Sequence, residues 1–200
     1  LSAQSSKKTK QSKSVQKTEE KTEKAFTISE FAKQLKDTVA TAGIDEALKL
    51  FDTVPEANQK DYEVRYMHAS LLLSANRSKE AKIIAESLLT ENKKNKDVLF
   101  LNALIAKSLN ERNKKSEYLQ ELLKIDPNNA EANAELGNEQ MTAKAYKKAK
   151  EYFLKSIKGN PSYISGLFGY GQACYYLGDF KDAQTAFNRI LSINPREDIA

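Results

Sequence analysis

Residues 164–197 read ISGLFGYGQACYYLGDFKDAQTAFNRILSINPRE, and the residues directly before them, 130–163, read AEANAELGNEQMTAKAYKKAKEYFLKSIKGNPSY. Pro161 and Pro195 stand at the same place in the two stretches, and Pro127 lies a further 34 residues upstream. Four alanines, Ala47, Ala81, Ala149 and Ala183, are spaced by the same step or by twice that step. A fixed period of this length predicts a stack of identical supersecondary units, which offers a long curved surface rather than one deep catalytic cleft.

The period divides the chain without insertion into five units, at residues 28–61, 62–95, 96–129, 130–163 and 164–197. Each unit holds two amphipathic stretches, which predicts an all-α array of about five helical hairpins. The breaks inside the units fall at or near Gly43, Asn76, Asn110, Lys144 and Gly178. Glycine and asparagine tolerate the left-handed conformation that ends a helix, so we expect a less regular turn at Lys144.

Small residues recur where the two helices of a hairpin would meet. In the first helices they are Ala69, Ala103, Gly137 and Gly171. In the second helices they are the periodic alanines. Four residues after this position most units carry a bulky side chain: Phe51, Phe153 and Phe187, with Leu119 at that place in the third unit. We expect the bulky residue to fill the space between one hairpin and the next. Leu35 and Lys115 depart from the pattern, because each stands where a small residue is expected.

The first 27 residues differ in composition from the rest of the chain. They hold seven lysines and three glutamates, so this segment carries +4 of the +5 net charge and leaves the array near neutral. Such a segment cannot bury enough apolar surface to order itself, and we expect a disordered basic tail that makes at most weak contact with an anionic surface. Thr27 and Glu30 form a capping-box pattern between Phe26 and Phe31, which places the first helix at Ile28. The neutral array argues against a nucleic-acid partner.

The remaining composition limits location and chemistry. The chain contains no run of 18 or more apolar residues, so a membrane-spanning helix is not expected. It begins at Leu1 rather than Met, and we expect that a signal sequence or a tag preceded it. His68 and Cys174 are the single histidine and cysteine, too few for a zinc site by themselves. We expect a packed His68 and a buried, inert Cys174 thiol, with no catalytic residues, no metal and no cofactor.

The last two units carry a pattern that resembles the tetratricopeptide repeat. In the fourth unit it consists of Leu136, Gly137, Tyr146, Ala149, Phe153 and Pro161, and in the fifth of Tyr170, Gly171, Gly178, Asp179, Phe180, Ala183, Phe187 and Pro195. The resemblance implies a right-handed superhelical array whose first helices line a concave groove for partner peptides. It also implies a non-enzymatic protein–protein interaction scaffold.

The resemblance further implies which residues face the groove. They form an apolar-aromatic wall with few charges: Tyr66, Leu73, Phe100, Leu104, Lys107, Asn138, Met141, Phe168, Gln172, Tyr175 and Tyr176. Some chaperone-binding members hold a C-terminal carboxylate with a Lys/Asn/Arg clamp. The corresponding places here hold Ala32, Tyr66, Phe100 and Phe168, so that ligand is not expected. An exposed apolar surface of this kind is typical of a binding site.

Other interpretations of the sequence stay open. The wall could instead be covered by the array or by the tail, or could bind a small apolar ligand. An exported bacterial envelope protein, periplasmic or tethered to a membrane through its tail or a lipid, that assists complex assembly or transport is the alternative function, and it is favoured over a cytoplasmic location. At the C-terminal end, the helix over 181–194 carries apolar residues and residues 198–200 look like the start of a further helix. A homodimer through this hairpin would cover that end.

Overall fold

The computed structural model describes residues 25–195, so the tail residues 1–24 and the C-terminal residues 196–200 lie outside the described part. Within that part the chain is all-α, with ten α-helices and two short 3₁₀ helices and without strands. The α-helices are α1 (Ile28–Ala42), α2 (Ile44–Lys49), α3 (Tyr62–Ser74), α4 (Ser78–Glu91), α5 (Lys96–Ser108), α6 (Arg112–Ile125), α7 (Ala130–Thr142), α8 (Tyr146–Gly159), α9 (Ile164–Leu177) and α10 (Phe180–Ile193).

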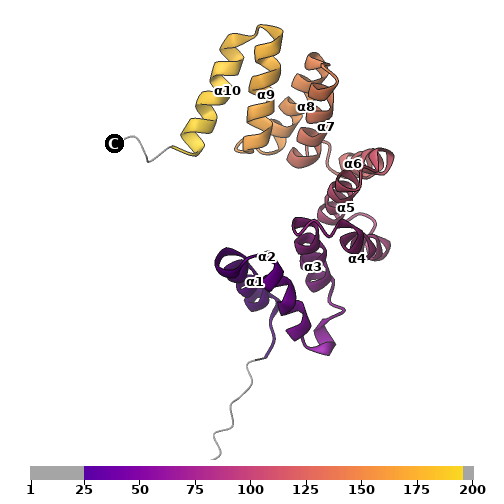
Figure 1. Ribbon diagram of the computed structural model, residues 1–200. Coiled ribbons are helices and arrows are strands. Elements are labelled where there is room, and N and C mark those ends of the chain that lie inside the picture. Colours follow the sequence, from indigo (N-terminus) through magenta and orange to yellow (C-terminus); the bar gives the residue numbers. More distant parts are fainter. Residues whose placement is uncertain (1–24, 196–200) are drawn as a thin grey trace, which may run out of the picture.

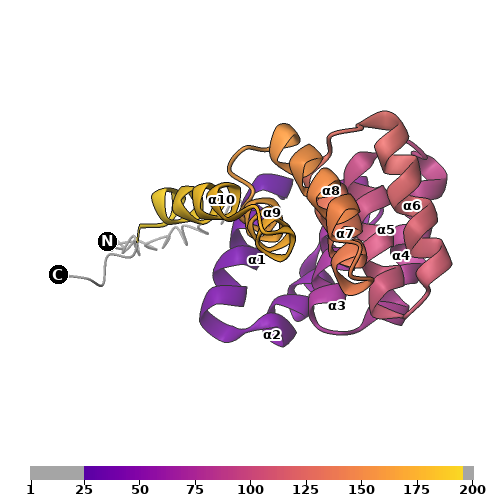
Figure 2. The same cartoon turned by 90° about the horizontal axis from the view of Figure 1, so that it is seen from above.

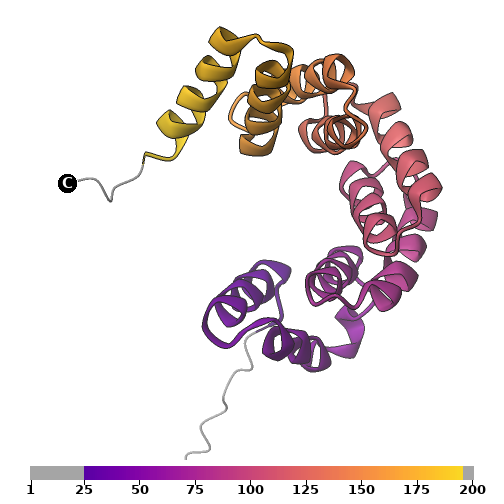
Figure 3. The ribbon, with the colours of Figure 1, turned by 45° about the horizontal axis from the view of Figure 1, so that its top comes forward.

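Consecutive helices pair as antiparallel hairpins that follow one another along an open arc (Figure 1). Figure 3 shows α3, α5 and α7 on the inner side of the arc and α4, α6 and α8 on its outer side. The two ends of the described chain face each other across the opening. The predicted superhelical array is confirmed, and the first helices of the hairpins line its concave side.

The first helix begins as the capping pattern predicts. The Thr27 hydroxyl oxygen accepts a hydrogen bond from the Glu30 backbone N–H at 3.3 Å, and the hydroxyl donates to the Glu30 carboxylate at 3.2 Å. The rings of Phe26 and Phe31 lie with their centroids 5.5 Å apart, so they form the predicted hydrophobic staple. Asn95 and Asn129 cap α5 and α7 in the same way, each accepting from the backbone N–H three residues later.

The turns inside the second, third and fourth hairpins share one backbone conformation. Asn76, Asn110 and Lys144 have φ values of 59°, 59° and 57°, in the left-handed region. In each case the next residue donates its backbone N–H to a carbonyl five residues earlier at 2.8 Å, which closes the helix end. The expectation of a less regular turn at Lys144 was therefore wrong. The lysine adopts the same geometry as the asparagines because the hairpin on either side imposes it.

The small residues lie in the helix contacts where the period predicts them. Ala47, Ala69, Ala81, Ala103 and Ala149 are all buried, as are the glycines that continue the pattern in α7 and α9. Around α8 the spacing is tightest. A Cβ atom added at Gly137 or Gly169 would lie 2.7 Å or 2.2 Å from the ring of Phe153, which is completely buried. The ring fills the space that these two glycines leave, and it joins the fourth hairpin to the fifth.

The first hairpin departs from the expected pair of full helices. Its second helix, α2, ends at Lys49 and continues only as two 3₁₀ helices, Leu50–Thr53 and Glu56–Asn58. Pro55 stands between these two segments, and a proline cannot continue an α-helix because it lacks the backbone N–H. Phe51 nevertheless reaches the core and packs edge-on against Phe31, with ring centroids 5.2 Å apart. The bulky position is kept although the helix around it is broken.

The turn at Lys144 yields a stability prediction. A non-glycine residue other than Asn or Asp in the left-handed region costs about 1–2 kcal/mol, and Asn76 and Asn110 show that asparagine fits this turn. We expect Lys144→Asn to raise the free energy of unfolding by roughly 0.5–1 kcal/mol. Urea denaturation measures the change, with Lys147→Asn in the neighbouring exposed first turn of α8 as the control. An unchanged or lowered stability for Lys144→Asn would contradict the account.

The contact at Phe153 yields a second prediction. Gly169→Ala places a methyl group 2.2 Å from the Phe153 ring, so we expect it to destabilise the protein by about 1–3 kcal/mol through overpacking. Thermal unfolding measures the loss. Ser165→Ala is the matched control, because Ser165 is exposed on the same helix and alanine favours the helix there. Equal midpoints for Gly169→Ala and the unaltered protein would show that the ring can move aside.

Candidate functional site

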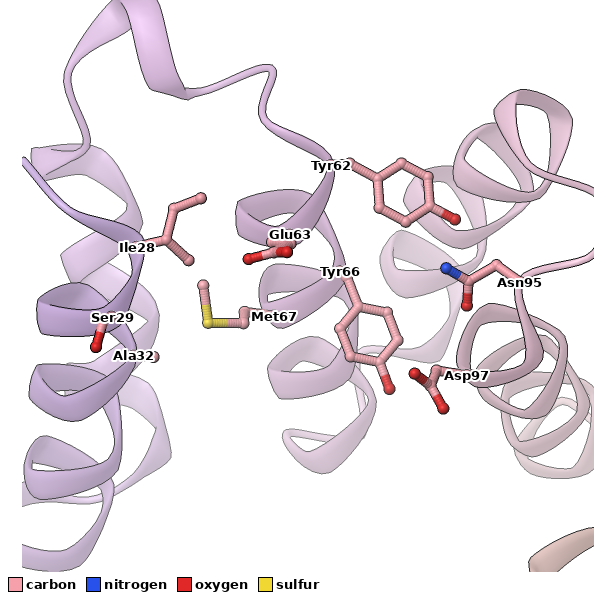
Figure 4. Close-up of a pocket in the computed structure, with 9 residues that line it drawn as sticks. All are labelled: Ile28, Ser29, Ala32, Tyr62, Glu63, Tyr66, Met67, Asn95 and Asp97. Atoms are coloured by element: carbon pink, nitrogen blue, oxygen red, sulfur yellow. The ribbon is translucent and has the colours of Figure 1, made fainter. Parts of the chain in front are cut away.

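The inner side of the array holds a pocket between α1, α3 and the start of α5. Its cavity volume is about 680 Å³. Figure 4 shows the lining residues, which are Ile28, Ser29, Ala32, Tyr62, Glu63, Tyr66, Met67, Asn95 and Asp97. Of the predicted wall residues, only Tyr66 lies in this pocket.

The pocket combines an apolar floor with negative charge. Ile28 and Met67 approach each other across the gap between α1 and α3, and the hydroxyl of Tyr66 points toward the Asp97 carboxylate (Figure 4). Burial, followed by the nearby charge of Asp97, raises the pKa of Tyr66 above its ordinary value, so the phenol stays neutral. Glu63 and Asp97 are exposed, and no ion pair within residues 25–195 neutralises either carboxylate. The pocket therefore offers two free negative charges beside an aromatic ring.

The predicted wall residues divide by exposure. Tyr66 and Leu73 are half-buried against the core between the second and third hairpins, and Phe100 and Met141 pack against the cores that follow. Leu104 and Gln172 are also half-buried. In this part of the array the aromatic and aliphatic side chains support the contacts between inner helices as well as the concave surface. Alone, the repeat register could not distinguish these two roles.

Three wall residues on α9 are well exposed. Phe168, Tyr175 and Tyr176 have exposed fractions of 50%, 59% and 58%. Tyr175 lies edge-on to Tyr176 and to Phe180, with ring centroids 5.9 and 5.7 Å apart, and Tyr146 stacks on Tyr176 at 4.7 Å. Tyr146 and Phe180 were not among the predicted wall residues, although their 34-residue separation puts them at the same repeat position.

The two polar wall residues have different surroundings. The Lys107 ammonium donates to both carboxylate oxygens of Glu135 at 2.8 Å, which joins α5 to α7 across the inner side. Asn138 is exposed on α7. The ion pair neutralises the one cation among the predicted wall residues, so the middle of the inner side carries little free charge.

Two sites have side chains that can take part in chemistry, the cluster around Cys174 and the imidazole of His68. Both are held by ion pairs or by packing. Cys174, Asp179 and Asp182 lie close enough to resemble a metal site, but the Lys150 ammonium donates to Asp179 at 2.7 Å and to Asp182 at 3.3 Å. The hydrogen bond to Asp179 raises the pKa of Lys150, and a fixed positive charge repels a metal cation. His68 is half-buried and stacks on Phe51 at 4.3 Å, and burial lowers its pKa below the ordinary value.

The fold and its inner surface define a helical-repeat protein, the class in which stacked hairpins build one extended binding surface. The family model of the tetratricopeptide repeat matches residues 130–163 and again residues 164–197. Residues 130–197 therefore form two tetratricopeptide repeats, and these matches support assigning the chain to the tetratricopeptide repeat family. A protein–protein interaction scaffold is the function that these repeats indicate, and proteins of the family are generally non-enzymatic.

Solved structures of repeat proteins share the fold. The tetratricopeptide repeat protein TTC0263 of Thermus thermophilus aligns with a TM-score of 0.67 and 15% identity, over 84% of this chain and 92% of that one. MamA from Desulfovibrio magneticus RS-1 aligns with a TM-score of 0.59 and 15% identity, over 85% and 96%. A tetratricopeptide repeat protein from Parabacteroides merdae ATCC 43184 has 21% identity and a TM-score of 0.59, over 84% and 67%. The comparison with curated proteins finds no match.

Within residues 25–195, no helix combines the length and the apolar composition that crossing a membrane requires.

The surroundings of Cys174 predict an unreactive thiol. Its side chain is fully buried, and burial raises its pKa, so little thiolate forms at neutral pH. We expect a thiol reagent to label the native protein at least tenfold more slowly than the protein unfolded in denaturant. A chain with Cys174→Ala and the exposed Ser165→Cys serves as the rapidly labelled control. Rapid labelling of native Cys174 would contradict the buried position.

Proposed function

We propose that the concave side of the array binds one segment of a partner protein. The segment places a cationic side chain in the pocket between α1, α3 and α5 and apolar side chains against the aromatic residues of α9. The pocket is the observation that carries this proposal, because it joins two free carboxylates, an aromatic ring and an apolar floor.

The pocket chemistry suits a lysine or arginine side chain. The aliphatic stem of such a side chain can lie against Ile28 and Met67 while its charged head reaches Glu63 and Asp97. A cation near the ring of Tyr66 gains a further contribution of about 0.5–1 kcal/mol at an exposed site. The same two carboxylates disfavour the small apolar ligand that the sequence left open, because such a ligand would desolvate them without a partner.

The far end of the groove suits apolar side chains. Phe168 occupies the same repeat position on α9 as Tyr66 on α3 and Phe100 on α5, so the three belong to one row along the inner helices. Phe168 and Tyr175 are members of the wall with exposed rings, and exposed aromatic rings are common anchors of protein interfaces. Electrostatic recognition at one end and aromatic contact at the other would set the direction of the bound segment.

Reversing one charge in the pocket tests this proposal. We expect Glu63→Lys to lower the affinity for a partner recovered by cross-linked pull-down about tenfold. The loss should come mainly from a slower association rate, and that rate should depend on salt. Glu117→Lys is the matched control, because it makes the same change at an exposed position on the outer helix α6. Binding by Glu63→Lys with the rate and salt dependence of the unaltered protein would remove the pocket from the proposal.

A further inference from the structure

The outer side of α8 carries a cluster of lysines. Figure 3 places α8 on the outer side of the arc, and Figure 2 shows it between α9 and α6 along the array. Helical periodicity puts six exposed residues of α8 on the side that faces away from the buried Phe153. We call them the α8 outer face: Lys147, Lys148, Glu151, Leu154, Lys155 and Lys158. Four lysines and one glutamate give this face a net charge of +3.

The equivalent faces of the other outer helices do not share this charge. At the same six repeat positions, the net charge is 0 on α6, −1 on α4 and +1 on α10. The charged residues at these positions are Lys114, Glu117, Glu121 and Lys124 on α6, Lys79, Glu80 and Glu86 on α4, and Lys181, Asp182 and Arg189 on α10. Because all four faces have the same place in the repeat, the fold does not require the lysines of α8.

The lysines of the α8 outer face are also unpaired. Within residues 25–195 none of them forms an ion pair, whereas Lys114 and Lys124 on α6 pair with Glu86 at 3.6 Å and with Glu121 at 2.5 Å. Two of the α8 lysines lie in the first turn of the helix, where the helix dipole disfavours a positive charge. Neither ion pairing nor helix stability therefore accounts for the cluster.

A hollow opens beside these lysines. It lies between α8 and the end of α7, has a volume of about 280 Å³ and is lined by Gln140, Lys148, Glu151, Tyr152 and Lys155. The Lys155 ammonium lies 5.6 Å from the centroid of the Tyr152 ring. Two ammonium groups beside one hollow suit a single phosphate group, which lysine binds as a point charge.

The composition of the face distinguishes between anionic partners. The face holds four lysines and neither arginine nor an aromatic residue, whereas protein interfaces are depleted in lysine and enriched in arginine and aromatic residues. Leu154 lies among the lysines with an exposed fraction of 54%. Clusters of about four to eight lysines or arginines on an amphipathic helix are typical of surfaces that contact anionic lipids. The convex side of an arc, unlike its groove, can also meet a flat membrane.

The chain itself offers no suitable cover for this face. The first 27 residues have a net charge of +4, so the lysines of α8 would repel them. The next helix, α9, packs on the other side of α8, where Gly169 lies against the Phe153 ring. The α8 outer face is therefore exposed in the middle of the array, with a hairpin on either side, and its charge selects an external anionic surface.

We propose that the α8 outer face binds the anionic surface of a lipid bilayer. The four lysines contact the phosphate groups of the lipids, one of which enters the hollow beside Tyr152, and Leu154 enters the headgroup layer. The concave groove lies on the opposite side of the array and stays open to a partner segment. Binding at the α8 outer face does not depend on binding in the groove.

Sedimentation with lipid vesicles tests the charge of the face. The full chain is mixed with vesicles of phosphatidylserine and phosphatidylcholine in equal parts, and with vesicles of phosphatidylcholine alone. One variant replaces all four lysines of the α8 outer face by glutamine. The matched control makes the same change at four exposed lysines elsewhere that form no ion pair within residues 25–195: Lys60, Lys79, Lys93 and Lys94. Both variants lose the same charge, and circular dichroism checks that each is folded.

We expect the unaltered chain to sediment with the phosphatidylserine vesicles and not with phosphatidylcholine alone. The α8 variant should bind about tenfold more weakly, and the control should stay within about twofold of the unaltered chain. An equal loss in both variants would mean that only the net charge matters, and no loss in either would place the binding in the basic residues 1–27. Either result overturns the proposal. Glu63→Lys, which tests the groove, should leave vesicle binding unchanged.

Fluorescence distinguishes a lipid surface from an acidic protein segment. The chain contains no tryptophan, so Leu154→Trp in the full chain reports on this face alone. We expect phosphatidylserine vesicles to shift its emission to the blue, and brominated phosphatidylcholine in those vesicles to quench it. Ile83→Trp is the control, because Ile83 is 73% exposed on the outer helix α4, and we expect neither change there. A shift of Leu154→Trp with soluble polyglutamate but not with vesicles, or an equal vesicle response at position 83, would overturn the proposal.

Discussion

The packing of the array depends on how closely two neighbouring helices can approach each other around one large side chain. At the junction between α8 and α9 the Phe153 ring lies against Gly137 on one side and Gly169 on the other, where an added Cβ would come within 2.7 Å and 2.2 Å of the ring. The periodic alanines allow the same approach inside every hairpin except the third, which carries Lys115 at that place. Because each junction adds a similar rotation, the hairpins form an arc, and the arc creates the concave side.

The two proposed binding surfaces follow from this packing in different ways. The groove belongs to residues left over on the inner helices once the contacts between hairpins are made, such as Glu63, Asp97 and the exposed rings of α9. The α8 outer face consists of residues on the side of an outer helix that faces away from those contacts, so the packing leaves their charge free to differ from one repeat to the next. One surface recognises a cationic side chain and apolar contacts, and the other recognises an anionic lipid surface.

Several local solutions appear where the period is broken. Ala85 replaces the bulky residue of the second unit, and the buried Asn102 side chain donates to the Ala85 carbonyl at 3.1 Å. Lys115 replaces a small residue, and its ammonium pairs with Glu139 on the next inner helix. These substitutions were visible in the sequence, but their partners were not, because each partner lies on a neighbouring hairpin at no fixed spacing. The same limit applied to the pocket, whose residues come from three helices.

The sequence by itself determined the helical class, the break positions and the small contact residues, because the period and the steric limits of glycine, alanine and proline act over a few residues. It also placed Tyr66 and Phe168 on one repeat position, and Tyr175 seven residues after Phe168 on the same helix. Only the tertiary structure decided which of these rings are exposed, that Lys144 adopts the left-handed turn, and that two carboxylates share a pocket with Tyr66. Exposure and charge pairing depend on distances between separate hairpins, and those distances arise only when the helices pack.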